Sequence, residues 1–149
     1  MNRHKCILVA EDDENDFFIL RRCLEKAGLI HKIVRVRNGQ AALDYLDGKP
    51  PFSDRDEHPF PDLLLTDLKM PCMDGFDLLR RLQFSRELSA LPVVVLSASF
   101  LGTDVQRAKS LGAREYLIKP ADVNEYREML LGLHQRWLRA GAPSSFNKQ

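Results

Sequence analysis

The chain has 149 residues, of which 44% are hydrophobic and 29% charged, and its formal net charge is +1. This size and composition are typical of one globular domain and exclude a largely disordered chain. The near-zero net charge gives no reason to expect direct binding to nucleic acid or to a membrane. No apolar run has the length of a membrane-spanning helix or the pattern of a signal peptide, so we expect a cytoplasmic protein.

Strand-like and helix-like patterns alternate along the chain. Short apolar runs predict five strands, at residues 6–10, 33–36, 62–66, 91–96 and 116–118. Helical spacing of apolar residues predicts five helices, at residues 14–27, 40–46, 75–84, 104–111 and from 123 onward. Proline-rich residues 49–61 predict an unusually long loop. We therefore expect an α/β domain over residues 1–140, with a parallel sheet covered on both faces, and a flexible polar tail over 141–149.

Acidic residues follow two of the predicted strands. Glu11 and Asp12 come directly after the first strand, and Asp67 follows the third. If these strands are neighbours in a parallel sheet, their carboxylates meet at one edge and repel one another unless a cation compensates. Mg²⁺ prefers such oxygen ligands, so the pattern favours a magnesium site. The alternative for residues 11–14 is a solvated acidic run that is favoured by the dipole of the following helix.

Ser97 and Lys119 end the fourth and fifth predicted strands. Taken singly, such residues are usually turn residues or solvated charges. Together with the acidic residues they supply the groups that phosphoryl transfer to a carboxylate requires. Asp67 would be the attacking group, Mg²⁺ and Lys119 would stabilise phosphoryl charge, and Ser97 would bond a phosphoryl oxygen.

Four sequence blocks carry these residues in order. They are Val9-Ala10-Glu11-Asp12-Asp13, Leu65-Thr66-Asp67-Leu68-Lys69-Met70-Pro71-Cys72-Met73-Asp74-Gly75, Val94-Val95-Leu96-Ser97-Ala98 and Tyr116-Leu117-Ile118-Lys119-Pro120. Together they resemble the receiver domain of bacterial two-component response regulators, over roughly residues 5–138. The resemblance implies a flavodoxin-like, doubly wound sheet of five parallel strands in the order 2-1-3-4-5, with five helices.

The resemblance also implies a metal site and a phosphoacceptor. Asp67 would accept a phosphoryl group from a sensor histidine kinase. Asp12 would bind Mg²⁺ or Mn²⁺ directly, and Glu11 would act through water. Asp67 and the backbone carbonyl of Lys69 would complete the protein's metal ligands.

The resemblance assigns switching to the last two strands. Ser97 would be the switch hydroxyl, Tyr116 the switch aromatic, and Lys119 would precede a cis proline. The alternative for Tyr116 is a side chain that only fills the surface of an edge strand. If these residues switch, the resemblance implies that signalling acts through changed protein–protein contacts. The face formed by the fourth helix, fifth strand and fifth helix would bind a downstream protein or a second copy of the chain. Trp137 and Phe146 could extend that face into a dimer contact; the alternative is that these C-terminal aromatic residues only hold the last helix in place.

Two positions depart from the commonest family pattern. Lys69 and Ser99 occupy places that are associated in the family with the rate of dephosphorylation, so this rate stays open. The long loop at 47–61, residues 42–46 before it and the lack of a second domain resemble the stand-alone receivers that partner phytochrome-type histidine kinases.

Two other functions compete with a phosphorylation switch. A phosphatase of the haloacid dehalogenase type also places an aspartate at a strand end, but it expects a second aspartate where this chain has Lys69. A degenerate receiver that only binds partners would lack some of the required residues, and none is missing here. We therefore expect no enzyme in the usual sense, but a phosphoacceptor that assists its own phosphorylation and slow dephosphorylation.

Overall fold

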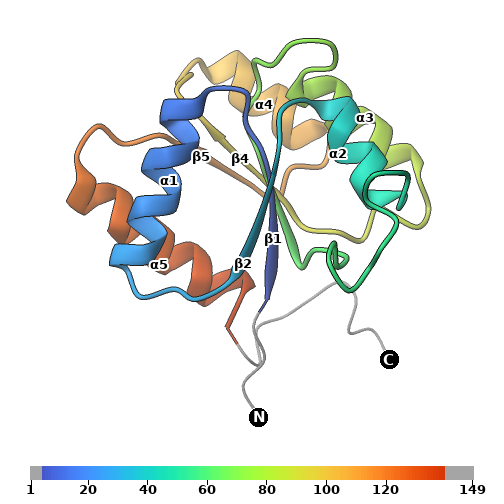
Figure 1. The fold of residues 1–149 in the computed structure, drawn as a ribbon. Coiled ribbons are helices and arrows are strands. Elements are labelled where there is room, and N and C mark those ends of the chain that lie inside the picture. The colour runs from blue at the N-terminus through green and yellow to red at the C-terminus, as the bar shows by residue number, and fades with distance from the viewer. Residues whose placement is uncertain (1–4, 140–149) are drawn as a thin grey trace.

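The computed structural model describes residues 5–139 as five strands alternating with five helices (Figure 1). In chain order the elements are β1 (Cys6–Ala10), α1 (Glu14–Lys26), β2 (Lys32–Val36), α2 (Gly39–Leu46), β3 (Leu63–Thr66), α3 (Gly75–Phe84), β4 (Val93–Ser97), α4 (Gly102–Ser110), β5 (Glu115–Ile118) and α5 (Val123–Trp137). Among these helices, none is long and apolar enough to cross a membrane. The predicted tail at 141–149 lies outside the described residues.

The sheet is fully parallel, and its strand order is β2-β1-β3-β4-β5. This confirms the predicted flavodoxin-like architecture. β1 and β3 are neighbours, with Val9 opposite Leu65 and Ala10 opposite Thr66. From β1 the chain moves first to one side of the sheet and then to the other, so the β1–β3 boundary is a topological switch point. In open α/β sheets, ligands bind outside the carboxyl ends of the strands at this place.

Helices cover both faces of the sheet, as Figure 1 shows: α1 and α5 lie on one face, and α2, α3 and α4 on the other. Side chains of β1 alternate between the two cores. Ile7 and Val9 belong to the core beneath α1 and α5, whereas Leu8 and Ala10 belong to the core beneath the other three helices. Burial on both faces explains why the strand sequences are almost continuously apolar.

Two element boundaries differ from the prediction by two residues. β4 begins at Val93, after Pro92, rather than at residue 91, because proline has no N–H for the ladder. The carbonyl of Pro92 still accepts a bond from the backbone N–H of Leu64 at 3.0 Å. α4 begins at Gly102 rather than at residue 104, and its N-cap residue, Leu101, makes no side-chain capping bond.

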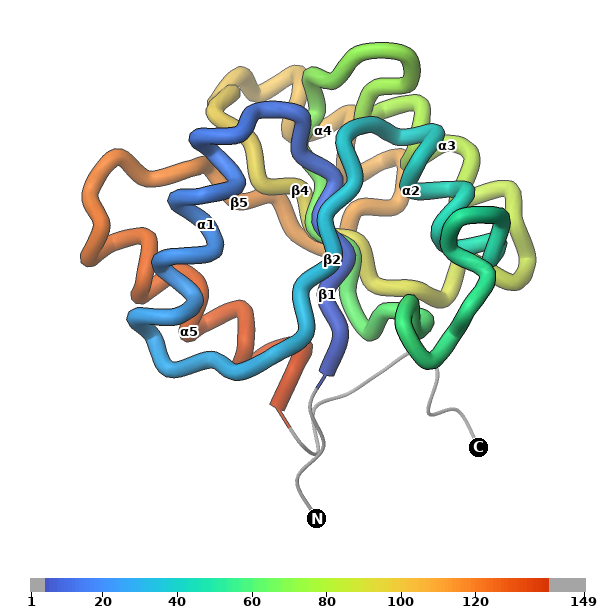
Figure 2. The backbone as a smooth tube through the Cα atoms, in the orientation of Figure 1, coloured from blue at the N-terminus to red at the C-terminus, as the bar shows by residue number. Residues whose placement is uncertain are grey.

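The long loop between α2 and β3 contains no helix or strand, as predicted, but tertiary contacts hold it. Figure 2 shows it folded back beside the end of α2. The fully buried Tyr45 donates its hydroxyl to the carbonyl of Pro59 at 2.8 Å. Arg55 donates to the carbonyls of Leu46 at 2.9 Å and His58 at 3.0 Å. The loop is therefore fastened to α2 at several points.

Candidate functional site

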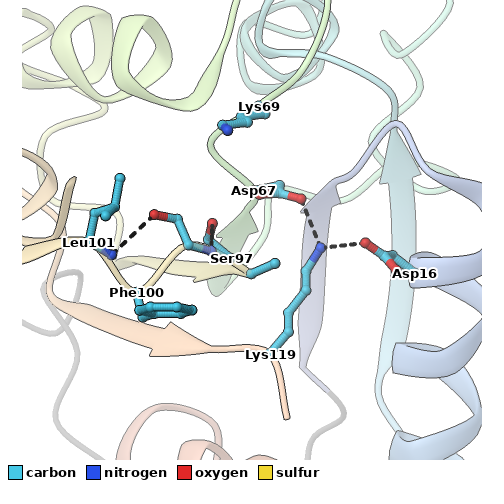
Figure 3. A pocket seen from close by; sticks show the side chains of 9 residues that line it. Asp16, Asp67, Lys69, Ser97, Phe100, Leu101 and Lys119 are labelled. Carbon is cyan, nitrogen blue, oxygen red and sulfur yellow. Dashed lines mark hydrogen bonds and ion pairs between the residues drawn. The ribbon is translucent and has the colours of Figure 1, made fainter. Parts of the chain in front are cut away.

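The carboxyl ends of β1, β3, β4 and β5 place Glu11, Asp67, Ser97 and Lys119 at one edge of the sheet. A cavity of about 360 Å³ opens at this edge (Figure 3). The residues that line it are Asp16, Asp67, Lys69, Ser97, Ala98, Ser99, Phe100, Leu101 and Lys119. Strand pairing thus brings together side chains that are more than a hundred residues apart in the sequence.

Lys119 is the centre of the charged group. Its Nζ donates to Glu11 Oε1 at 2.8 Å, Asp16 Oδ2 at 2.7 Å and Asp67 Oδ2 at 2.8 Å. Figure 3 shows the ammonium between Asp16 and Asp67. Burial disfavours its charge, but the hydrogen bonds to Asp16, Asp67 and Glu11 outweigh burial and raise the pKa of Lys119 above its ordinary value. The side chain therefore stays cationic at physiological pH.

Glu11 is buried, with only 5% of its surface exposed. Burial is the main cause that raises the pKa of Glu11 to about 7, and the charge of Asp67 adds to it. The bonds that its carboxylate accepts from Lys119 and from the backbone N–H of Asp13 act in the opposite direction. A carboxyl group with this pKa exchanges a proton near neutral pH and responds readily to a bound cation.

Asp67 has one oxygen tied to the backbone and one tied to Lys119. Its Oδ1 accepts from the N–H of Leu68 at 2.6 Å, and its own N–H donates to the carbonyl of Ala10 at 3.0 Å. The following loop turns back tightly, because Gly75 donates to the carbonyl of Leu68 at 2.8 Å. A Cβ at Gly75 would lie 2.3 Å from the carbonyl oxygen of Asp67, so only glycine fits there. The tight turn holds the Asp67 backbone in place beside the cavity.

A chain of hydrogen bonds leads from Ser97 toward β5 and α4. The buried Ser97 hydroxyl oxygen accepts from the N–H of Ser99 at 3.1 Å. Ser99 donates its hydroxyl to Asp104 at 2.6 Å, and its carbonyl accepts from the hydroxyl of Tyr116 at 2.8 Å. The Ser99 hydroxyl oxygen also accepts from the N–H of Leu101 at 3.3 Å. The half-buried Tyr116 ring packs against the core beneath α2, α3 and α4.

Asp12 does not join the carboxylate group that the structure forms. The residues with ligand atoms within 4.8 Å of one another are Glu11, Asp16 and Asp67, whereas the side chain of Asp12 is exposed. Successive residues at the end of an extended strand point to opposite sides, so Glu11 turns inward and Asp12 outward. Sequence reasoning missed Asp16. No strand-end signal marked it, because Asp16 lies in the first turn of α1 and Asp12 lies before that helix begins.

All ligand atoms in this carboxylate group are oxygens. Hard divalent cations such as Mg²⁺ and Mn²⁺ bind oxygen ligands, so the residues present fit such an ion. Lys69, the other cationic side chain at the cavity, is exposed and lies away from Lys119 (Figure 3). The two lysines flank Asp67 from different sides.

The expected cis proline after Lys119 is not found. Within residues 5–139 the cis bond joins Pro50 and Pro51, and the bond between Lys119 and Pro120 is trans. The trans form is the ordinary preference of a bond before proline. Lys119 reaches all three carboxylates in this form, while its backbone N–H donates to the carbonyl of Ser97 at 2.9 Å.

Known proteins share both this sequence and this fold. Response regulator Rcp1 of Synechocystis sp. is 30% identical over 137 residues, which cover 92% of this chain and 91% of the relative. The structure of the Mn²⁺-bound form of response regulator Rcp1 matches 94% of this chain and 99% of its own, with 29% identity and a TM-score of 0.79.

Two further solved structures are more similar in fold. Response regulator RPA3017 in red light signalling of R. palustris has a TM-score of 0.88 and 34% identity, over 94% of this chain and 99% of its own. The phosphorylated cyanobacterial phytochrome response regulator RcpA has a TM-score of 0.84 and 30% identity, over 95% and 99%. A sequence model of the response regulator receiver domain matches residues 7–131. The chain therefore belongs to the response regulator receiver domain family, whose members are phosphorylation-dependent signalling switches.

Proposed function

We propose that Asp67 is the phosphoacceptor of this switch. The observation that carries the proposal is the position of its carboxylate at the cavity, 2.8 Å from the Lys119 ammonium. An Asp67 oxygen would form a bond to phosphorus while the bond from phosphorus to a nitrogen of the kinase histidine breaks. Lys119 would stabilise negative charge on the transferred group, and Ser97 would donate its hydroxyl to a phosphoryl oxygen. The chain would thus assist its own phosphorylation and also its own dephosphorylation, which would be slow.

We assign four protein ligands to Mg²⁺ or Mn²⁺: Glu11, Asp12, Asp67 and the backbone carbonyl of Lys69. The carboxylate oxygens of Glu11 and Asp67, which lie in one group, and the Mn²⁺-bound form of Rcp1 support this assignment. When bound, the ion would neutralise charge on the phosphoryl oxygens. Asp12 is a ligand in this assignment although its side chain is exposed, and Asp16 keeps its place as a partner of Lys119.

Switching would begin at Ser97 and pass through Ser99. When the Ser97 hydroxyl turns to a phosphoryl oxygen, its bond from the N–H of Ser99 weakens. The carbonyl and hydroxyl of Ser99 hold Tyr116 and Asp104, so a shift of Ser99 would reach β5 and α4 together. A phosphoryl group brings about two negative charges to the pocket, enough to select between two packings of a neighbouring segment.

The donor that we propose is a phytochrome-like sensor histidine kinase in the cytoplasm. The red-light and phytochrome relatives support this choice. The output would be a downstream protein or a second copy of the chain, bound at the face formed by α4, β5 and α5. Leu101 and Ile118 are exposed there, at 59% and 46%. Trp137 is less available than its position in the sequence indicated, because it donates to Glu115 at 2.7 Å.

Intact mass after incubation with acetyl phosphate and Mg²⁺ tests the phosphoacceptor. The wild-type chain should gain the mass of one phosphoryl group, and Asp67→Asn should gain none. Asp56→Asn, which changes an exposed carboxylate in the long loop, is the matched control and should behave like the wild type. An unchanged mass gain in Asp67→Asn would contradict the assignment of Asp67 as the phosphoacceptor. No mass gain in the wild type would favour a receiver that only binds partners.

Backbone amide spectra with and without beryllofluoride, a phosphoryl mimic, test the switch. We expect shifts in the pocket loops and also across residues 101–126. Shifts confined to the loops that carry Asp12, Asp67 and Lys119 would contradict the proposed path.

A further inference from the structure

Arg35 of β2 reaches across the end of β1 to the loop that carries the acidic residues. Its Nε donates to the backbone carbonyl of Glu11 at 2.9 Å. Its Nη1 pairs with Glu14 Oε1 at 3.1 Å, and its guanidinium lies 5.2 Å from the centre of the Phe17 ring. Only 12% of its side chain is exposed.

These contacts hold the acidic loop at both ends. The Glu11 carbonyl is where the chain leaves β1, and Glu14 is the first residue of α1. Asp12 and Asp13 lie between them. The guanidinium group is planar and its donors have fixed directions, so one side chain ties both ends in a single geometry.

We propose that Arg35 is a positioning residue for the metal site, acting through the backbone of Glu11 and the first turn of α1. This inference rests on the metal ligands assigned above. By fixing the Glu11 carbonyl, Arg35 sets the direction in which the Glu11 side chain enters the site and the direction in which the backbone continues to Asp12. Residues that orient metal ligands in this way commonly change metal affinity by about ten- to a hundredfold when they are replaced.

Two arguments separate this role from a purely structural one. First, Nη2 of Arg35 is buried and has no hydrogen-bond partner among the described residues. A buried N–H without a partner costs free energy, so this nitrogen does not stabilise the fold, and Glu14, which loses one of its partners when Arg35 is replaced, is exposed to solvent. Second, a cation beside a metal site repels the metal ion, so electrostatics alone predicts tighter binding when Arg35 is removed. Positioning predicts weaker binding, and the two explanations differ in sign.

The test compares Arg35→Met with Arg37→Met. Arg37 also pairs with Glu14, at 2.7 Å, but it is 61% exposed and makes no bond to the Glu11 carbonyl. Both variants remove one positive charge near Glu14, and methionine keeps an apolar stem against Phe17. Titration with Mg²⁺ and with Mn²⁺ should give about tenfold weaker binding for Arg35→Met. Arg37→Met should bind as tightly as the wild type or slightly more tightly.

Phosphorylation by acetyl phosphate provides the second readout. For Arg35→Met the initial rate should need about tenfold more Mg²⁺ to reach half of its maximum, whereas the maximum itself should match the wild type within about twofold. Thermal unfolding without metal should stay within about 3 °C of the wild type. A structural role would instead lower the unfolding temperature and reduce the rate at every Mg²⁺ concentration.

Arg35→Lys decides the question if Arg35→Met does not fold. Lysine keeps the charge, but its single ammonium cannot reproduce the fork, so binding should weaken about threefold. Metal affinity equal to the wild type in Arg35→Lys, or equal to Arg37→Met in Arg35→Met, would overturn the inference. A wild-type chain that binds neither Mg²⁺ nor Mn²⁺ would overturn the metal site itself. Metal binding that is normal in the wild type and unchanged when Arg35 is replaced would overturn only the role of Arg35.

Discussion

The loop after β4 lines the cavity, and the loop after β1 leads into α1, whose Asp16 also lines it, yet the two loops are held very differently. In the loop after β1, Asp13 caps α1 by accepting from the N–H of Asp16 at 2.9 Å, and its own N–H donates to Glu11 at 3.1 Å. In the loop after β4, Phe100 and Leu101 are 76% and 59% exposed, and no side chain caps α4 from the N-cap position.

The difference separates a binding loop from a moving one. A cation site profits from ligands that are fixed before the ion arrives, because ordering them on binding would weaken affinity. A switch segment needs the opposite, since regions with little buried apolar surface open at low free-energy cost. The loop after β4 depends on Ser99 for its attachment to Tyr116 and Asp104. We therefore expect metal binding to depend on the first loop and signal output on the second.

The largest expected effect is on metal binding in the first loop. Asp12→Asn should weaken Mg²⁺ binding by about a hundredfold or more, because it removes a charged ligand. Asp16→Asn should weaken it only about threefold, since Asp16 bonds Lys119 and acts on the ion through charge alone. Isothermal titration of both variants measures the contrast. The reverse order would make Asp16 the ligand and Asp12 a solvated neighbour.

The next effect is a pH dependence of metal binding. Since the pKa of Glu11 is raised to about 7, its carboxyl group is protonated below that pH, and the ion must displace the proton. Mg²⁺ affinity should fall about tenfold for each pH unit below 7. Glu11→Gln should bind weakly at every pH with a flatter profile. A wild-type Mg²⁺ affinity that stays constant between about pH 5.5 and about pH 7 would contradict the predicted pH dependence.

The same group makes the metal-free protein less stable as pH rises. Between the ordinary pKa of 4.5 and the folded value of about 7, the folded chain keeps a proton that the unfolded chain has lost. The contribution of Glu11 to the free energy of unfolding is therefore largest below pH 4.5 and declines up to about pH 7. Thermal unfolding of the wild type and of Glu11→Gln across this range should show the decline only in the wild type. Saturating Mg²⁺ should reverse it.

A smaller effect is expected in the second loop. Ser99→Ala removes the bonds from Ser99 to Asp104 and from Leu101 to Ser99, so the start of α4 should open more often. Hydrogen exchange of the amides at 101–105 should become about fivefold faster, as the loss of about 1 kcal/mol implies. Amides in the first turn of α1 serve as the internal control and should not change. Equal acceleration in both helices would mean that the loops are not independent.

The smallest expected effect concerns the two helix starts. Asp13→Ala removes the side-chain cap of α1 and should cost about 1 kcal/mol of stability, or about 3 °C. Leu101→Asp offers α4 a cap that it lacks and should raise stability by about half that amount. Thermal unfolding measures both. If Leu101→Asp also impairs the response of residues 101–126 to beryllofluoride, the uncapped start is part of the switch.

Much of the fold and part of the site follow from local signals. Alternating strand and helix patterns predicted a doubly wound parallel sheet, and the strand order agrees. The placement of Glu11, Asp67, Ser97 and Lys119 at strand ends predicted one shared edge, which the structure forms. The misses in element boundaries are local: β4 starts after Pro92, and α4 starts at Gly102 without the side-chain cap that marks helix starts in a sequence.

The sequence by itself determined which residue types end each strand, because the short apolar runs mark where strands end. It also predicted that these residues meet, because parallel strands end at a common edge of the sheet. Only the tertiary structure decided which carboxylates face inward and what holds them there. Asp16 rather than Asp12 meets Lys119, and Arg35 reaches the Glu11 carbonyl from a neighbouring strand. The reason is geometric: side-chain direction at a strand end and contacts between segments far apart in the chain depend on packing, which leaves no periodic trace in the sequence.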